Sequence, residues 1–200
     1  MSSEFYLTAS RVQNALRAVQ YHQRNLVVSL WGHILNIEFS REDGWYFRYH
    51  VHLYPGVLPY RLLPQWRRWQ HSPSVRANRC YLLVITWPHD SYEFGRHRKF
   101  GDDTREAILQ VMTLSPNDEI SDFHITIAVA NELAVEFWVW TGRQYGRPDL
   151  KRLVVEDKDD GREISGPLHV VDDAEKVHRV LQHVKGRAES LVDTDGIDLS

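Results

Sequence analysis

Two histidines separated by one residue, His50-Val51-His52, form the sharpest pattern with chemical potential in this sequence. Alternate side chains of a β-strand lie on one face, so we expect the two imidazoles about 7 Å apart along the strand. Imidazole nitrogens are common ligands of metal ions. Glu38, on what we predict to be the preceding strand of the same hairpin, adds a carboxylate oxygen. Glu38, His50 and His52 are therefore a candidate site for one divalent metal ion.

The order of Glu38 and His50-Val51-His52 resembles the His-hydrophobic-His motif of the rolling-circle replication nucleases. The resemblance implies that both histidines and an acid bind a divalent cation, which polarises the scissile phosphate. It also implies a nucleophilic tyrosine on a downstream helix. The tyrosines available here, Tyr92 and Tyr145, lie in segments that we predict to be loops.

A third histidine lies in the stretch His124-Ile125-Thr126-Ile127. This stretch resembles the hydrophobic-His-x-Thr element of the 2H phosphoesterases. That resemblance implies two facing strands whose histidines act as general base and general acid. The second copy of the element would be His50-Val51-His52, with a histidine in place of the hydroxyl residue. His50, His52 and His124 are thus the candidate catalytic residues if the protein is an enzyme.

Arginines alternate with aromatic residues between positions 61 and 99, which we call the Arg/Trp segment. It holds eight basic and two acidic residues, a net charge of +6, whereas residues 101–200 hold eleven basic and twenty-one acidic residues. Arg and Trp are enriched at the energetic centres of protein interfaces, and cationic grooves with stacking aromatics bind single-stranded nucleic acid. We expect a binding surface here, with a protein partner favoured and single-stranded nucleic acid as the alternative. Its candidate binding residues are Arg61, Trp66, Arg67, Arg68, Trp69, Arg76, Arg79, Arg96 and Arg98.

Composition narrows the class of protein. The chain has 200 residues, one cysteine and a formal net charge of −3, so it can build a core but cannot form an internal disulfide. Cys80 begins an apolar run and is expected to be a core residue. No apolar run reaches 18 residues and no signal sequence is evident, so we expect a soluble, intracellular, cytoplasmic protein without a membrane partner. The sequence contains no GxSxG, GxxxxGK[ST], GxGxxG or CxxC motif.

Hydrophobic periodicity indicates the elements that position these residues. We predict helices over 9–22 and 103–112 and a last helix from Asp172, with Glu175 as its capping partner and an apolar stripe. The stripe comprises Val177, Val180, Leu181 and Val184. Predicted strands are 26–39 with 45–55 as one hairpin, 80–87, 123–140 as a second hairpin, and a weak strand at 153–155. The run LPQWRRWQ after Leu63 is predicted to form one or two helical turns.

Together these elements predict an α+β fold in a single domain, residues 1–188. Its centre would be an antiparallel sheet of two long hairpins plus a buried strand, flanked by three or four helices. An acidic C-terminal tail, 189–200, is expected to fray. The sequence favours a non-catalytic binding or accessory protein that needs no cofactor. The alternative is a metal-dependent phosphodiester-processing enzyme with one divalent metal ion.

Overall fold

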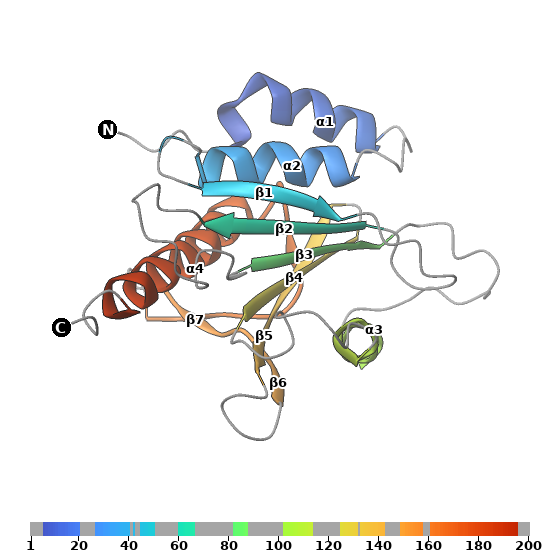
Figure 1. Ribbon diagram of the computed structural model, residues 1–200. Helices are drawn as coiled ribbons and strands as arrows, with labels where there is room; N and C mark the ends of the chain where they lie inside the picture. Colours follow the sequence, from blue (N-terminus) through green and yellow to red (C-terminus); the bar gives the residue numbers. More distant parts are fainter. Residues whose placement is uncertain are drawn as a thin grey trace.

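Helices cover both faces of a mixed β-sheet in the computed structural model of the protein (Figure 1). The structure describes residues 6–20, 27–40, 42, 45–50, 60–66, 82–87, 102–113, 125–131, 133–142, 149–157 and 161–195. Both helices and a multi-stranded sheet are present, so the predicted α+β class is confirmed.

Runs of β-branched and aromatic residues supply the strands of the sheet. The strand order is β1-β2-β3-β4-β5-β6, and the short strand β9 also pairs with β5. The bounds are β1 Trp45–His50, β2 Tyr60–Trp66, β3 Leu82–Trp87, β4 Ile125–Asn131, β5 Ala134–Thr141, β6 Asp149–Arg152 and β9 Leu168–His169. Two further strands, β7 Val155–Glu156 and β8 Glu163–Ile164, pair only with each other.

Strands β3 and β4 run parallel, whereas every other strand pair in the described part of the chain is antiparallel. A parallel neighbour is reached only by a crossover connection, and the chain between these strands contains α3, Asp102–Thr113. The expectation of a wholly antiparallel sheet is therefore wrong at this pair, and the sheet is mixed.

Two hydrophobic cores lie on opposite faces of the sheet. The first core joins the sheet to η1 Tyr6–Thr8, α1 Ser10–Gln20, α2 Val27–Glu38 and α4 Ala174–Asp195. The second core lies under α3, which contributes Ile108 and Met112. Because successive strand residues face opposite sides, Val84 of β3 packs in the first core and Ile85 in the second. This double burial explains the continuous apolar run of the strand.

Several predicted elements are confirmed. The helices expected at 9–22 and 103–112 are α1 and α3, and the buried strand at 80–87 is β3. The hairpin at 123–140 is β4 and β5, which turn between Asn131 and Ala134. The last helix is α4, and its predicted stripe of Val177, Val180, Leu181 and Val184 is buried.

The prediction of strands at 26–39 is wrong, because this segment is the helix α2. Its buried side chains recur at helical spacing: Val27, Leu30, Trp31, Ile34 and Leu35. The segment contains several residues that favour strands, such as Val and Ile, and this composition obscures the helical spacing of its buried residues. Burial of these residues in the core outweighs their weak preference for strands. The first predicted hairpin therefore does not form. Strand β1 instead pairs antiparallel with β2.

The predicted helical turn after Leu63 is also wrong in the part that the structure describes, since Pro64–Trp66 belongs to strand β2. Proline lacks a backbone N–H and is poorly tolerated between two strand neighbours. Pairing of β2 with β3 covers Tyr60–Leu62 only, so Pro64 lies where β1 alone is a strand partner. The proline therefore breaks no ladder between β2 and β3.

Helix α4 continues to Asp195, beyond the point at which the sequence predicts a frayed tail. Residues 196–200 of that tail lie outside the described residues. Within the described part of the chain, no helix combines the length and the apolar character needed to cross a membrane.

Candidate functional site

The sequence-predicted site residues fall mainly on β1, β2 and segments that the structure does not describe. His50 ends β1, and its Cα partner is Arg61 in β2. Trp66 ends β2, opposite Trp45. The remaining candidates lie outside the described residues: His52, Arg67, Arg68, Trp69, Arg76, Arg79, Arg96, Arg98 and His124.

Strand register places His50 and Arg61 on the sheet face that carries α3. Arg61 pairs with His50 on one side and with Ile85 on the other, and Ile85 lies in the core under α3. Directly paired residues share a face of the sheet, and so do residues two apart along a strand. Arg48 of β1 therefore occupies a position on this face as well. The β1–β2 part of the face carries basic positions, whereas the β3–β5 part is largely apolar.

Glu38 does not lie on a strand beside His50. It is the last residue of α2, and its side chain is 1% exposed. The shared hairpin on which the Glu38–His50–His52 metal site depended does not form, so that geometric basis is wrong. Among the described residues, no three His, Cys, Asp or Glu side chains converge as a metal site would require. The metal-binding hypothesis for His50 and His52 stays a prediction.

The buried carboxylate of Glu38 instead joins α2 to α4 by partly buried hydrogen bonds. His178 Nδ1 lies 2.8 Å from both Oε1 and Oε2, and Gln182 Nε2 donates to Oε2 at 2.9 Å. His178 and Gln182 are one helical turn apart, so they lie on the same side of α4. A carboxylate accepts only, so we assign the proton of the His178 contact to Nδ1.

Tyr6 is fully buried where η1 meets the start of α4. Its hydroxyl donates to the carbonyl oxygens of Val170, at 2.8 Å, and Ala174, at 3.3 Å. Burial raises the pKa of the phenol far above its usual range, and the negative charges of Glu38 and Asp173 raise it further. Tyr6 therefore remains a neutral hydrogen-bond donor that ties the N-terminal helices to α4.

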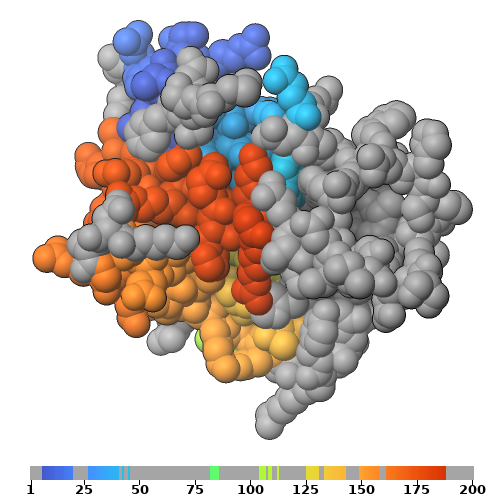
Figure 2. Space-filling model, turned by 90° about the vertical axis from the view of Figure 1, so that its left-hand side faces the viewer, coloured from blue at the N-terminus to red at the C-terminus, as the bar shows by residue number. Residues whose placement is uncertain are grey.

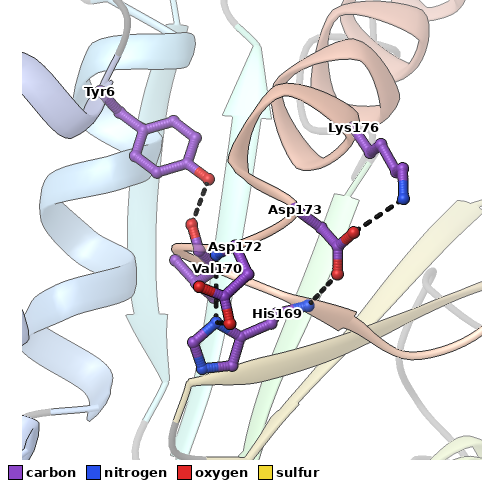
Figure 3. Close-up of polar contacts among 6 residues, drawn as sticks. All are labelled: Tyr6, His169, Val170, Asp172, Asp173 and Lys176. Atoms are coloured by element: carbon purple, nitrogen blue, oxygen red, sulfur yellow. Dashed lines mark hydrogen bonds and ion pairs between the residues drawn. The ribbon is translucent and has the colours of Figure 1, made fainter.

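A second polar cluster lies in the turn between β9 and α4 (Figure 3). Asp173 immediately precedes α4, and its carboxylate accepts a hydrogen bond from the backbone N–H of His169 at 3.0 Å. Lys176 Nζ contacts the other oxygen at 2.7 Å. The hydrogen bond from Lys176 is the main reason that the pKa of Asp173 is lowered, and the His169 amide adds to it. His169 itself contacts Asp172 through Nδ1.

Both clusters place a histidine beside a carboxylate, an arrangement that can fix a tautomer or carry a proton. They lie along α4, which crosses the face in Figure 2 between α1 and α2 (blue) and the segment 149–170 (orange). Among the described residues, no group of His, Cys, Asp or Glu side chains at either cluster could hold a metal ion.

Sequence reasoning missed His178, Gln182, His169 and Asp173 as interacting residues. The spacing of four between His178 and Gln182, beside the apolar stripe of α4, indicates a shared helix side. Their partner Glu38 lies 140 residues from His178, and no local pattern reveals such a contact.

Comparisons with known proteins gave no further guidance, because no family model, no curated protein and no solved structure matches this chain.

Proposed function

We propose that the protein is a non-catalytic binding protein that contacts an acidic protein partner through the Arg/Trp segment. The observation that carries this proposal is the strand register of β1, β2 and β3. It assigns Arg48, His50 and Arg61 to positions on one sheet face. In this proposal, the positive charges of Arg48 and Arg61 attract the acidic surface of the partner.

Arg61 is the first residue of the Arg/Trp segment, and further basic residues follow it in the sequence. Residues 61–99 carry a net charge of +6, mostly from arginine, and include Trp66, Trp69 and Trp87. Arginine and tryptophan contribute large contact areas and directed hydrogen bonds at protein interfaces. Two parts of the segment lie on strands of the sheet, since Arg61–Trp66 belongs to β2 and Leu82–Trp87 is β3. Backbone anchoring of this kind lowers the entropy cost of binding.

The proposal includes a cytoplasmic location. It treats single-stranded nucleic acid and metal-dependent phosphodiester cleavage as competing outcomes, because no described contact favours either of them.

The test is affinity capture with the full chain, in which the double variant Arg67→Ala/Arg68→Ala is compared with the native protein. The matched control is Arg11→Ala/Arg17→Ala, which removes the same charge from the exposed side of α1. We expect a captured partner to bind the first variant at least tenfold more weakly and the control within twofold. Affinity should also fall as salt rises, because exposed charges are screened.

Three outcomes contradict the proposal. One is equal loss of partner affinity in both double variants. Another is tighter binding of labelled single-stranded DNA or RNA than of any captured protein. The third is Mg²⁺- or Mn²⁺-dependent cleavage of a phosphodiester substrate that His50→Ala/His52→Ala abolishes.

A further inference from the structure

His169 has two alternative partners on the same residue, Asp172 (Figure 3). Its Nδ1 accepts a hydrogen bond from the backbone N–H of Asp172 at 3.1 Å. The same Nδ1 lies 3.0 Å from Oδ2 of the Asp172 carboxylate. One ring nitrogen therefore faces a donor and an acceptor at nearly equal distance.

An imidazole nitrogen cannot serve both partners at once. The amide N–H of Asp172 donates to Nδ1, so the neutral ring is the tautomer that carries its proton on Nε2 and a lone pair on Nδ1. This lone pair repels the carboxylate oxygen of Asp172. The protonated ring carries a proton at Nδ1, which donates to the carboxylate and repels the amide N–H. The choice between the two contacts therefore follows the protonation state of the ring.

We propose that protonation of His169 exchanges these partners, which makes the turn between β9 and α4 a proton-sensitive junction. When the ring is neutral, the Asp172 amide is hydrogen-bonded to it. When the ring is protonated, the amide loses this acceptor and an imidazolium–carboxylate pair replaces it. The proton comes from solvent, since the side chain of His169 is 38% exposed.

The carboxylate of Asp172 contacts the ring directly, and the charge of Asp173 also interacts with the ring. Both oxygens of Asp173 are engaged, one by Lys176 and the other by the amide of His169. From η1, Tyr6 stays neutral and bonds to Val170. From β5, the strand partner of His169 is Ala134, which carries no charge.

The N-terminal helices, the β-sheet and α4 meet at this junction. Val170 N donates to Leu133 O at 2.6 Å, Asp173 N donates to His169 O at 2.8 Å, and Tyr6 is bonded to Val170. These contacts use atoms other than His169 Nδ1, so they persist in both protonation states. The exchange is thus confined to Asp172.

The test is residue-resolved amide hydrogen exchange of the full chain at pH 8 and pH 5, which bracket the range in which imidazoles titrate. After correction for intrinsic exchange rates, we expect protection of the Asp172 amide to fall at least fivefold at pH 5. The amides of His169, Val170 and Asp173 are internal controls and should change less than twofold. Equal protection of Asp172 at both pH values overturns the proposal.

One variant isolates the ring. His169→Asn places an amide oxygen near the position of Nδ1, so the acceptor remains but carries no proton at either pH, and the amide of Asp172 should stay protected at both pH values. A native-like pH response in His169→Asn also overturns the proposal.

Discussion

Glu38 at the end of α2 and His178 in α4 are joined by a partly buried contact in which Nδ1 lies 2.8 Å from both carboxylate oxygens. The two residues are 140 positions apart. Because Gln182 donates to the same carboxylate, one buried acid fixes two side chains of α4 against α2. This relationship explains why an acid can lie among the apolar residues of the first core.

Glu38→Ala is expected to destabilise the fold by about 2–4 kcal/mol, since it removes the acceptor of two hydrogen bonds and leaves a cavity. Urea unfolding measures this loss. Glu106→Ala, on the exposed side of α3, is the control and should cost less than about 0.5 kcal/mol. Equal effects of the two substitutions would show that the contact between α2 and α4 contributes nothing to stability.

Tyr6→Phe is expected to cost about 1 kcal/mol at neutral pH, because two buried carbonyls lose a donor. Its pH dependence is more diagnostic. The folded pKa is raised above the unfolded value of 10.0, so this contribution is complete below pH 10 and is lost as pH rises further.

The native protein should therefore lose more stability than Tyr6→Phe between pH 9 and pH 11. Thermal unfolding across that range measures the difference between the two proteins. Parallel stability curves would contradict the buried, protonated phenol.

Periodic patterns allowed part of the fold to be predicted. The stripe of Val177, Val180, Leu181 and Val184 predicts α4 because an amphipathic helix buries one side only. The hairpin of β4 and β5 is predicted because both strands are rich in apolar residues and a short turn joins them. Helix α2 was missed because it is apolar on most sides, and such a segment has the composition of a buried strand.

The candidate site depends on distant contacts, which a single sequence does not encode locally. Glu38 is predicted from the sequence as a metal ligand, but that prediction rests on a hairpin that does not form. Its true partners, His178 and Gln182, come from a helix near the other end of the chain. The basic character of residues 61–99 needs no contact information, which is why it can be recognised from the sequence.

Asp173→Asn should weaken the acid dependence of stability. The pKa of Asp173 is lowered from 3.8, mainly by its hydrogen bond to Lys176. A lowered folded pKa contributes stability above the unfolded pKa, and that stability is lost as pH falls through the folded value. Between pH 5 and pH 2, the native protein should therefore lose more stability than Asp173→Asn.

Lys176→Met tests the assigned cause, because it removes the main partner of Asp173 but keeps its carboxylate. Its acid unfolding profile should resemble that of Asp173→Asn. A profile identical to that of the native chain would assign the lowered pKa to the His169 amide instead.

Arg152→Met should destabilise the sheet where β5 and β6 pair. Arg152 Nε lies 2.9 Å from the fully buried carboxylate of Glu136, and the guanidinium carbon lies 5.5 Å from the ring centre of Trp138. Removing the guanidinium takes a charge-assisted partner from a buried acid and a cation from the aromatic face. We expect a loss of about 1–3 kcal/mol in urea unfolding, with altered Trp fluorescence in the folded state.

The neighbouring substitution Lys151→Met is the matched control. Lys151 is also on β6, but its side chain is 78% exposed and pairs with the half-exposed Asp149. Exposed ion pairs contribute little, because water already solvates both charges. Lys151→Met should therefore leave the urea midpoint within error. If both variants lost a similar free energy of unfolding, the cause would be the introduction of an apolar side chain on β6, and not the loss of the Arg152–Glu136 contact.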